Sequence, residues 1–519
     1  MKKSVFLLVA VAALVLTGCQ FGPNSFDEED EDSSSLNEDS TTSQNAGRSS
    51  TSQNNGRTST SQNTGRSSSS SSSKSSSSNS SSSSHTPSGE HIDNDYFSIY
   101  VPEDTSMMSS NCKKYVDDMR NQQRKYLSEN GQGSDYYLND LYGTNGVDLT
   151  KGITEGDQGG YRPANLQNAY LDPVAAKWED GEKSDENKGV IIDFTPSASL
   201  KNKTYTVSYS VNQDMSDAKT ETTSGNYISL KNLLVNQKYY VSVSAEGHSS
   251  ETISFTTGDY PRWINARPMF NVRDHGGYMT STGQRIKQGL IYRGGEITPA
   301  VGWKSGSYYT GDVGGRYTGS NGTMQDGHIT TQTNESKEVF RNVMGMVNGL
   351  EIDLRSSSER NNYSACGFAN SGDISYKLLS ISSYDNGMKN NKTEIKQVFE
   401  AFAQADQHPV YYHCYGGADR TGVVGFMLGA LLGMSYTDLV IDFELTTYSS
   451  NPSRNYRSHL RAGPYNYWPR MVTYLKSTLG WSSSKTMKQS MEDFLVNQCS
   501  VSQSTINKIR QIMLEPIDL

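Results

Sequence analysis

The sequence predicts a multidomain protein: a β-sandwich and an α/β domain of three layers, both preceded by a disordered N-terminal tether. Three observations predict this arrangement. The chain has 519 residues, too many for one compact domain. Apolar and polar residues alternate with a period of two between about residues 190 and 255. A short apolar strand, a glycine-containing loop and an apolar helix follow one another between residues 409 and 432.

The composition argues against two classes of protein. A net charge of −9 disfavours a protein dominated by nucleic-acid binding, because phosphate backbones attract basic surfaces. Five cysteines are far too few for a disulfide scaffold. The sequence leaves open whether Cys366 and Cys499 pair with each other, and it does not fix the state of Cys112. We expect no nucleic-acid partner.

Residues 1–18 resemble a bacterial lipoprotein signal peptide. Two lysines precede the apolar run 5–16, which is too short to span a bilayer by itself. The run ends in Leu-Thr-Gly-Cys, and in such signals the cysteine, here Cys19, is lipidated and becomes the mature N-terminus. An ordinary secretory peptide or a retained anchor helix is the alternative. The resemblance implies a lipid anchor in the membrane and a location on the extracytoplasmic face of a bacterial cell.

Residues 19–92 are predicted to form a disordered, serine-rich tether. Six acidic residues at 27–32 precede three copies of a nine-residue repeat, and serine runs follow. So few apolar side chains cannot offset the entropy of ordering the segment. About 70 flexible residues have an end-to-end distance of roughly 45 Å. The tether could therefore carry a domain well away from its anchor.

Residues 93–170 receive no fold assignment. We expect one helix near their start, ending at Asn130, where an Asn-Gly pair interrupts the pattern. The apolar face of that helix consists of Tyr115, Val116, Met119, Tyr126 and Leu127. The remainder is rich in glycine, asparagine and tyrosine, and no functional site is recognised in it.

Residues 171–258 are predicted to form the sandwich. The expected strands are 190–194, 205–211, 227–230, 239–245 and 253–255. This alternation resembles a fibronectin type III domain. Leu233 and Tyr239 stand where that family has its tyrosine corner, and Phe194 stands where it has a core tryptophan. The resemblance implies a spacer, with binding of surface partners as the alternative.

Cys414 and Arg420 bracket five residues in a loop that is suited to binding phosphate. A loop of this length before a helix can turn its backbone N–H groups toward one anion. Gly416 and Gly417 allow the positive φ values that such a curl requires. Arg420 can hold two phosphate oxygens. The same positive field favours the thiolate of Cys414, the form that can attack phosphorus.

Thr421 extends this interpretation, because its hydroxyl can assist the sulfur as leaving group when a phospho-cysteine is hydrolysed. The alternative is a buried structural cysteine beside an unrelated arginine, which the glycines and the strand–helix context disfavour. The predicted substrate-binding residues are Tyr415, Gly416, Gly417, Ala418, Asp419 and Thr421.

Residues 413–422, His-Cys-Tyr-Gly-Gly-Ala-Asp-Arg-Thr-Gly, resemble the signature loop of cysteine-dependent protein tyrosine phosphatases. The ending Ala-Asp-Arg-Thr-Gly is similar to the atypical bacterial branch, tyrosine-phosphatase family 3. The other segments similar to that branch are 271–278, 290–296, 350–356, 442–446 and a closing helix at 502–513. The resemblance covers residues 262–515 and implies an α/β catalytic domain.

Two features depart from that family. Ala418 stands where the family often has a lysine associated with activity on phosphoinositides. Residues 303–327 form an inserted stretch rich in glycine and tyrosine. An inositol-polyphosphate phosphatase of the same superfamily is the alternative activity. Tyr415 and Ala418 disfavour it, because such a pocket is expected to be lined by many basic residues.

Two aspartates are candidates for the general acid. The chain contains no Trp-Pro-Asp, so the mobile acid loop of the larger phosphatases is absent. The resemblance points to Asp353, at the end of a predicted strand, and an ion pair with a neighbouring arginine is its alternative role. Asp419, inside the loop, is the second candidate. His413 is expected to hydrogen-bond the loop, and Arg273 and Asp274 to support the site.

These features together predict an anchored, extracytoplasmic phosphatase acting on phosphotyrosine in proteins or on small phosphomonoesters. Cys414 is the expected nucleophile, Arg420 the phosphate ligand and Asp353 the acid. We expect no cofactor, and no metal because the eight histidines are scattered. A disulfide on Cys414 would inactivate such an enzyme. A non-catalytic surface-binding or adhesion protein that uses the sandwich is the alternative from another functional class.

Overall fold

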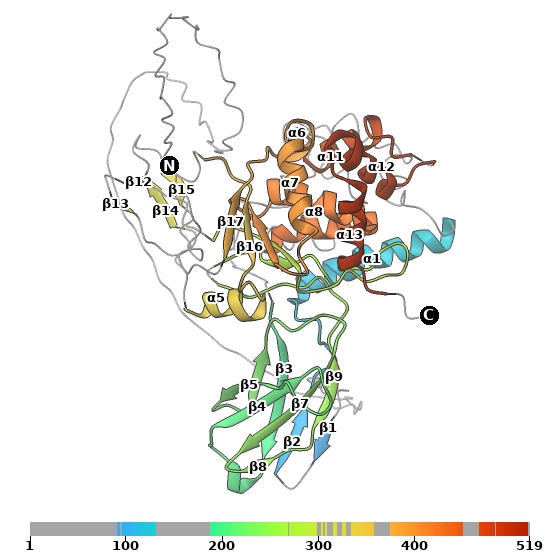
Figure 1. Cartoon of the computed structure of the whole chain (residues 1–519). Coiled ribbons are helices and arrows are strands. Elements are labelled where there is room, and N and C mark those ends of the chain that lie inside the picture. The colour runs from blue at the N-terminus through green and yellow to red at the C-terminus, as the bar shows by residue number, and fades with distance from the viewer. Residues whose placement is uncertain are drawn as a thin grey trace, which may run out of the picture. The chain divides into compact units, whose positions relative to one another are not determined.

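The computed structural model describes residues 91–93, 96–130, 187–267, 269–297, 334–357, 374–449, 467–482 and 484–516, with four short strands between 303 and 327 (Figure 1). The chain divides into two units, 1–82 and 83–519, and all described residues belong to the second. The predicted signal peptide, Cys19 and nearly all of the predicted tether lie outside the described residues. None of the helices in these ranges combines the length and apolar character needed to cross a lipid bilayer.

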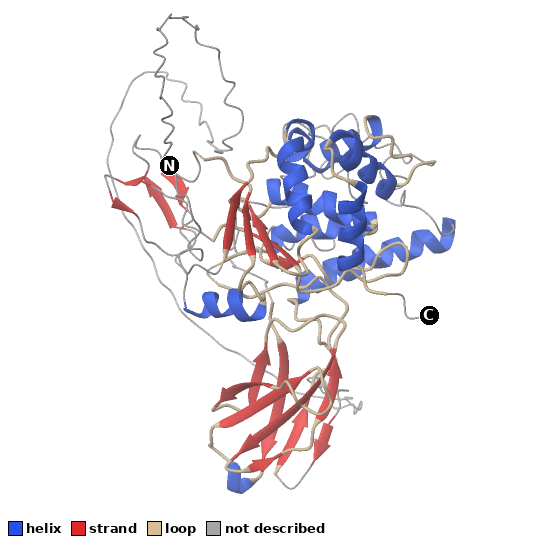
Figure 2. Ribbon diagram, in the orientation of Figure 1, coloured by secondary structure: helices blue, strands red, loops and turns tan. Residues whose placement is uncertain are grey.

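Two antiparallel sheets, which we call the two-sheet module, occupy the region where the sequence predicts a sandwich (Figure 2). The first has the order β1 (His91–Asp93), β2 (Phe97–Tyr100), β3 (Val190–Pro196), β6 (Tyr227–Leu230). The second has the order β5 (Lys219–Thr223), β4 (Tyr205–Ser210), β7 (Lys238–Ala245), β8 (His248–Ser249), with β9 (Ile253–Thr256) also paired to β7. Alternate residues of both sheets enter one shared hydrophobic core.

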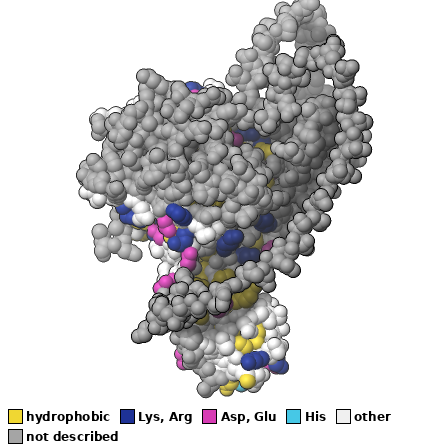
Figure 3. Space-filling model, turned by 180° about the vertical axis from the view of Figure 1, so that it is seen from behind, with side chains coloured by type: hydrophobic (Ala, Val, Ile, Leu, Met, Phe, Trp, Pro, Cys, Tyr) yellow, Lys and Arg dark blue, Asp and Glu magenta, His cyan; other side chains and the backbone are white. Residues whose placement is uncertain are grey.

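Aromatic side chains join the two sheets. The ring of Phe194 on β3 packs edge-on against Tyr205 on β4, with 4.9 Å between centroids. The hydroxyl of Tyr239 accepts a hydrogen bond from the N–H of Leu234, at 3.0 Å. Tyr239 thus contacts the backbone a few residues upstream, at the position where the sequence suggested a tyrosine corner. Much of the surface of this module in Figure 3 is white, the colour of uncharged polar side chains and backbone.

The module uses segments to which the sequence analysis gave no structure. Strands β1 and β2 lie within residues 91–100, ahead of the expected start at residue 171, and β2 pairs with β3. Phe97 and Ile99 do alternate with polar residues, but the run is short. Strand β5 has the sequence Lys-Thr-Glu-Thr-Thr and lies at a sheet edge, where polar side chains remain in solvent. Its lack of apolar residues explains why periodicity did not reveal it.

The helix expected before residue 130 is present as α1 (Ser110–Asn130). Its buried residues Cys112, Tyr115, Val116 and Met119 belong to the same hydrophobic core as the C-terminal α/β region. Arg120 of α1 forms an ion pair with Asp438 of that region, with 3.0 Å between Nη2 and Oδ1. Although α1 follows β2 in the chain, it is therefore packed as part of the C-terminal region.

The C-terminal region is built on a five-stranded sheet with the order β10-β11-β18-β16-β17. The strands are β10 (Arg273–Asp274), β11 (Ile291–Gly294), β18 (Val410–His413), β16 (Leu350–Asp353) and β17 (Ser375–Leu378). Only β10 runs antiparallel to its neighbour. Because the other four are parallel, the carboxyl ends of β11, β18 and β16 lie along one edge of the sheet. In open α/β sheets this edge is where ligands bind.

Successive residues of β18 point to opposite faces of the sheet. Val410 and Tyr412 enter a large helical core, while Tyr411 packs with Phe340 in a smaller cluster on the other face. The helices are α5 (Asn334–Glu338), α6 (Tyr384–Asn390), α7 (Lys392–Phe402), α8 (Asp419–Leu432), α9 (Tyr436–Glu444), α11 (Tyr467–Ser477), α12 (Met487–Asp493) and α13 (Gln503–Met513). The helices of the large core thus cover one face of the sheet, and the segment that follows α5 packs on the other face, which agrees with an α/β domain (Figure 2).

The insertion at 303–327 contains two short antiparallel strand pairs. They are β12 (Trp303–Lys304) with β13 (Ser307–Tyr308), and β14 (Gly315–Thr318) with β15 (Met324–Gly327).

Candidate active site

The predicted phosphate-binding loop connects β18 to α8. Cys414 follows the last residue of β18 and is 2% exposed. Helix α8 begins at Asp419, so its N-terminus, where backbone N–H groups lack helical partners, adjoins the loop. Arg420 is the second residue of that helix and is half-buried. The strand, loop and helix therefore follow one another as the sequence predicts.

The backbone of the loop depends on glycine. Gly417 has φ +66°, a left-handed conformation that side chains rarely adopt. A Cβ at this position would also lie 2.5 Å from the carbonyl oxygen of Gly294 and 2.6 Å from the nitrogen of Gly295. The N–H groups of Gly416, Gly417 and Ala418 donate to no acceptor in the described part of the chain. These three amides are therefore available to an anion.

The carbonyl groups of the loop are held from one side by a cluster that we call the arginine network: Asn271, Arg273, Arg293 and Asp442. The Asn271 side chain donates to the carbonyl oxygens of Gly416 and Gly417, at 3.1 and 3.0 Å. Arg293 donates to the same oxygen of Gly417 at 3.1 Å. Because these carbonyls are turned toward the network, the amides of the loop are left to face the other way.

Asp442 lies between the two arginines of this network. Its carboxylate accepts a hydrogen bond from Arg293, and its backbone carbonyl accepts one from Arg273 at 2.9 Å. Arg273 also donates to Asn271. Burial and the nearby Arg293 lower the pKa of Arg273 to about 10, which leaves it charged at neutral pH. Two buried cations thus face one carboxylate, and the net positive charge favours a bound anion.

His275 adjoins the arginine network. Neither of its ring nitrogens has a hydrogen-bond partner in the described part of the chain, and the residue is fully buried. Burial lowers its pKa to about 4, and the positive charges of Arg293 and Arg273 act in the same direction, against the attraction of Asp442. His275 is therefore neutral at physiological pH.

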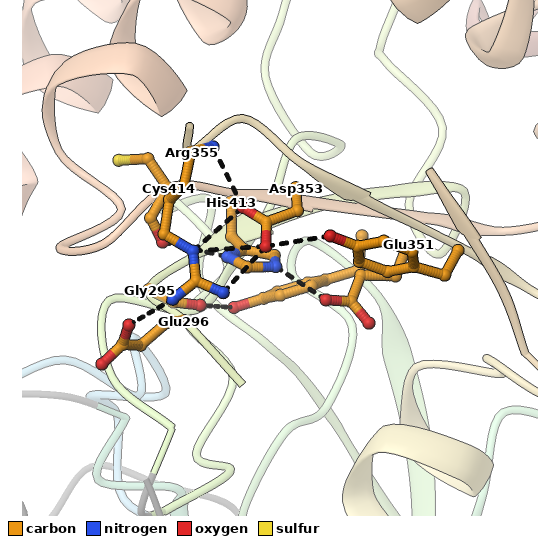
Figure 4. Close-up of polar contacts among 9 residues, drawn as sticks. Gly295, Glu296, Glu351, Asp353, Arg355, His413 and Cys414 are labelled. Atoms are coloured by element: carbon orange, nitrogen blue, oxygen red, sulfur yellow. Dashed lines mark hydrogen bonds and ion pairs between the residues drawn. The ribbon is translucent and has the colours of Figure 1, made fainter. Parts of the chain in front are cut away.

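A second cluster, the carboxylate network, lies at the ends of β16 and β18: Glu296, Glu351, Asp353, Arg355 and His413 (Figure 4). His413 Nδ1 is 2.9 Å from the carbonyl oxygen of Cys414, and Nε2 is 2.8 Å from Glu351. Arg355 donates to Glu296 at 2.6 Å and from Nη2 to Asp353 at 2.8 Å. The expected hydrogen bond from His413 to the loop is present.

Asp353 is tied to its neighbours through both carboxylate oxygens. Arg355 donates to Oδ1 from Nε at 3.0 Å and to Oδ2 from Nη2, and the Tyr376 hydroxyl donates to Oδ2 at 3.2 Å. Burial acts to raise the pKa of Asp353. The charge on His413 and the hydrogen bonds from Arg355 outweigh it and hold this pKa well below its usual range. A carboxylate held ionised and fully buried is poorly suited to deliver a proton to a leaving group.

Asp419 is in a different environment. It is half-buried at the first position of α8, and one of its carboxylate oxygens accepts a hydrogen bond from the hydroxyl of Tyr384. Tyr384 itself has φ +54°, an uncommon conformation for a residue other than glycine. Thr421, two positions on, has a fully buried hydroxyl with no hydrogen-bond partner among the described residues. That hydroxyl is available to a neighbouring sulfur.

The carboxylate network also contains three residues of types that bind metals. One ligand atom from each of Glu351, Asp353 and His413 lies within 4.8 Å of the others. The oxygens of Asp353 are already engaged by the guanidinium of Arg355, and His413 faces Glu351. The positive charge that a metal would supply is thus present as Arg355, and we interpret the cluster as an ion-pair network.

Asp274 supports segments near β10 and β11, and its hydrogen-bond partners lie outside the phosphate-binding loop. Its carboxylate accepts from Arg262 at 2.7 Å and from the backbone N–H groups of Gly276 and Gly289, at 2.8 and 2.7 Å. It therefore fixes two turns near β10 and β11. Arg273 was expected to support the site together with Asp274. It belongs instead to the arginine network.

Among the described cysteines, Cys112 and Cys499 do not enter the site. Cys112 and Cys499 are buried, and each keeps its thiol. Burial raises the pKa of the Cys499 thiol to about 12, so this thiol is not reactive at neutral pH. The suggested partner of Cys499, Cys366, lies outside the described residues.

Comparison with known families agrees with this site. Residues 264–302 and 312–515 match the model of the tyrosine phosphatase family. The matched segments contain β11, β16, β18, the loop and α8, and they leave out residues 303–311 at the start of the insertion. Together with the loop geometry, the match supports a cysteine-dependent phosphatase domain. The sequence predicted this domain over residues 262–515.

A solved structure is also similar to part of the chain: the core catalytic domain of the PP-IP phosphatase SIW14 from S. cerevisiae, in complex with citrate. The two are 14% identical over 30% of this chain and 86% of that one, with a TM-score of 0.18. A TM-score this low does not establish a shared fold. No curated protein matches the chain at a significant level.

The sequence analysis gave no role to several residues of the two networks. These are Asn271, Arg293, Glu296, Glu351, Arg355 and Asp442. All of them lie in segments noted for their resemblance to the phosphatase family. A further signal was available, because Arg293 and Glu351 are charged residues inside otherwise apolar strands. A charge at such a position is buried and must be paired.

Proposed function

We propose that this protein hydrolyses phosphomonoesters through a phospho-cysteine formed on Cys414. The observation that carries the proposal is the loop between β18 and α8. Its carbonyls at Gly416 and Gly417 are held by Asn271 and Arg293, while the amides of Gly416, Gly417 and Ala418 have no acceptor in the described part of the chain. Such a loop binds a tetrahedral oxyanion directly over the nucleophile.

The reaction has two steps. The thiolate of Cys414 attacks phosphorus, a sulfur–phosphorus bond forms, and the bond from phosphorus to the leaving oxygen breaks. Arg420 and the loop amides hold the phosphoryl oxygens in both steps. Water then attacks phosphorus, inorganic phosphate leaves, and Cys414 departs as a thiolate assisted by the hydroxyl of Thr421. The enzyme returns to its starting state without a cofactor.

For the proton on the leaving oxygen we favour Asp419 over Asp353. Two observations support this choice. Asp353 is fully buried, engaged through both oxygens, and kept ionised by Arg355 and His413. Asp419 adjoins the loop, is half-exposed, and accepts a hydrogen bond from Tyr384. The same carboxylate can accept the proton of the attacking water in the second step.

As substrate we propose phosphotyrosine, in proteins or as a small phosphomonoester. The family description supports this choice, and so do Tyr415 and Ala418 in a loop where binding of several phosphates would favour basic residues. A screen of phosphotyrosine peptides, phosphoserine peptides and inositol polyphosphates tests it. A higher kcat/KM for an inositol polyphosphate than for every phosphotyrosine peptide would replace this substrate assignment.

We also propose that the enzyme is lipid-anchored through Cys19 on the extracytoplasmic face of the membrane. The motif Leu-Thr-Gly-Cys at 16–19 supports this location. The two-sheet module is proposed to be a spacer of the fibronectin type III kind, supported by its strand alternation and by the hydrogen bond at Tyr239. Fractionation of cells that express the full chain, compared with Cys19→Ala, tests the anchor.

The nucleophile is tested with Cys414→Ser in the full chain. We expect turnover of p-nitrophenyl phosphate to be abolished, because a hydroxyl is not ionised at neutral pH. Binding of inorganic phosphate should persist, since the loop amides and Arg420 remain. Wild-type turnover in this variant would exclude the mechanism. Activity should also survive EDTA, because Arg420 and the amides supply the positive charge.

A further inference from the structure

Glu351 and His413 form a fully buried pair at the start of the loop (Figure 4). Glu351 lies on β16 and His413 ends β18, the neighbouring parallel strand. Nε2 of His413 is 2.8 Å from Oε1 of Glu351, and Nδ1 is 2.9 Å from the carbonyl oxygen of Cys414. The second oxygen of Glu351 has no hydrogen-bond partner among the described residues. Its contact with His413 is therefore the main polar contact that the structure gives Glu351.

The positions of these atoms fix the number of protons. A backbone carbonyl can only accept a hydrogen bond, so Nδ1 of His413 must carry a proton. Nε2 faces a carboxyl oxygen, and a hydrogen bond there requires a second proton, either on Nε2 or on Glu351. A neutral imidazole carries one proton. The second proton therefore lies between Nε2 of His413 and Oε1 of Glu351, and Glu351 holds it there.

The groups around His413 act on the same proton. Asp353 on β16 attracts positive charge on His413, while Arg355 interacts with both Asp353 and Glu351. Arg355 also binds Glu296, and the ring of Tyr411 stacks on the imidazole with centroids 5.6 Å apart. Three carboxyl groups thus surround one arginine and one histidine. Both ring nitrogens of His413 thus face acceptor atoms, Oε1 of Glu351 and the carbonyl oxygen of Cys414.

The hydrogen bond from Nδ1 sets the orientation of one peptide unit of the loop. A trans peptide places its C=O and N–H on opposite sides. With the carbonyl of Cys414 directed at His413, the N–H of Tyr415 points away from His413. A charge-assisted donor holds this orientation more firmly than a neutral one.

We propose that Glu351 is a positioning residue for the reaction of Cys414. By holding the second proton of His413, it makes Nδ1–H a charge-assisted donor and fixes the peptide unit that follows the nucleophile. This inference rests on the proposed function, since it assigns to Glu351 a part in forming the phospho-cysteine. Glu351 acts through His413 and touches no reacting atom.

The test compares Glu351→Leu, which fills similar space without an acceptor, with Glu351→Gln, which can donate to Nε2 but cannot hold the proton. We expect kcat/KM for p-nitrophenyl phosphate near pH 7 to fall about 10–100-fold with leucine, the range for one buried charged hydrogen bond, and by less with glutamine. The deficit of the leucine variant should narrow toward about pH 5, because an imidazolium carries both protons whatever its partner. A purely structural role predicts the same deficit at every pH.

Repeating Glu351→Leu in a protein that already carries His413→Asn distinguishes the positioning role of Glu351 from general destabilisation. An asparagine amide can donate to the Cys414 carbonyl without help from Glu351, so adding Glu351→Leu should change kcat/KM by less than about twofold. Full additivity of the two substitutions would overturn the proposal, and so would a folded Glu351→Leu variant with wild-type kcat/KM. If thermal unfolding shows that the leucine variant is not folded, the glutamine variant is tested instead. Its loss of kcat/KM should then disappear in the His413→Asn background.

Failure of the proposed function gives a different result. If Cys414→Ser retains turnover, the phospho-cysteine mechanism itself is wrong. If Cys414→Ser is inactive while Glu351→Leu equals the wild type at all pH values, the mechanism stands and only the role of Glu351 is excluded.

Discussion

The arginine network and the carboxylate network hold the same loop but carry opposite balances of charge. In the first, Arg273 and Arg293 face the single carboxylate of Asp442. In the second, three carboxyl groups face Arg355 and His413. Both networks hydrogen-bond carbonyl groups of the loop, at Gly416 and Gly417 on one side and at Cys414 on the other.

This difference suggests a division of tasks. Carbonyls engaged on both sides leave the loop amides to face a bound oxyanion. The arginine network adds net positive charge where a phosphate dianion must be stabilised. The carboxylate network adds none, so it cannot contribute in that way. Its contact is with the carbonyl of the nucleophile, and we infer that it positions Cys414 rather than attracting substrate.

The largest expected effect distinguishes the two aspartates. Asp419→Asn should lower kcat for phosphotyrosine or phenyl phosphate by about 10²–10⁴-fold, the span for a lost general acid. p-Nitrophenyl phosphate should suffer less, since its leaving oxygen needs a proton less. The basic limb of the pH profile should flatten. Stopped assays with both substrates over the pH range measure this.

Asp353→Asn is the matched comparison from the carboxylate network. It removes an ion pair with Arg355, so we expect kcat to fall by a similar factor for both substrates. The basic limb of the pH profile should remain unchanged. The reverse pattern, with leaving-group dependence in Asp353→Asn and none in Asp419→Asn, would restore Asp353 as the acid.

Gly417→Ala should disable the loop where the arginine network contacts it. The substitution requires alanine at φ +66° and places a Cβ 2.5 Å from the carbonyl oxygen of Gly294. We expect kcat/KM to fall by about 10²-fold or more, because displacement of the loop by about 1 Å misplaces the amides. Gly283→Ala is the control: its φ is +80°, but nothing lies within 4 Å of the added Cβ. That control should keep wild-type kcat/KM.

Asn271→Ala removes the hydrogen bonds to the carbonyls of Gly416 and Gly417 without changing a charge. We expect kcat/KM to fall by about 10–100-fold, with weaker inhibition by inorganic phosphate, because two loop amides lose their orientation. Asn232→Ala is a close control. Asn232 also has a positive φ, +62°, and bonds backbone groups, those of Asn265, outside the loop. Equal losses of activity in both variants would show that the effect is general destabilisation.

Local sequence patterns predicted the parts of the fold that local chemistry determines. The apolar run before Cys414 became β18, and the segment from Asp419 became α8. The closing helix α13 has Ser502 as its N-cap, whose side chain accepts from the N–H of Thr505. Strands β3, β4 and β7 follow the predicted alternation. Strand β18 and helix α8 are buried on all sides, so a continuous apolar run was the signal for them. Each strand of the two-sheet module buries one face, so alternation was the signal there.

Contacts between distant segments were not predictable in this way. Asn271 reaches Gly416 across 145 positions of the chain, and Arg293 reaches Asp442 across 149. Periodicity carries no information about which charged residues meet. The same limit affected Asp353. Its position at a strand end was predicted, and an ion pair with a neighbouring arginine was named as the alternative to a role as acid. The motif did not decide between the two, because the pairing with Arg355 depends on side-chain geometry.

The smallest expected effect concerns the stability of the arginine network in acid. His275 has a pKa of about 4 in the folded protein, below the ordinary value of about 6.5 expected in the unfolded chain. Between these two pH values His275 is protonated in the unfolded chain but neutral in the folded protein. The free energy of unfolding therefore falls as the pH is lowered from about 6.5 to about 4. By about pH 4.5 the loss in the free energy of unfolding that is due to His275 is on the order of 2–3 kcal/mol.

Urea unfolding at several pH values measures this effect. The free energy of unfolding should fall less in acid for His275→Gln than for the wild type. His408→Gln, at an exposed histidine, should match the wild-type slope. If His275→Gln instead loses as much stability as the wild type between pH 7 and 4.5, the arginine network tolerates a third cation and its charge balance does not limit stability.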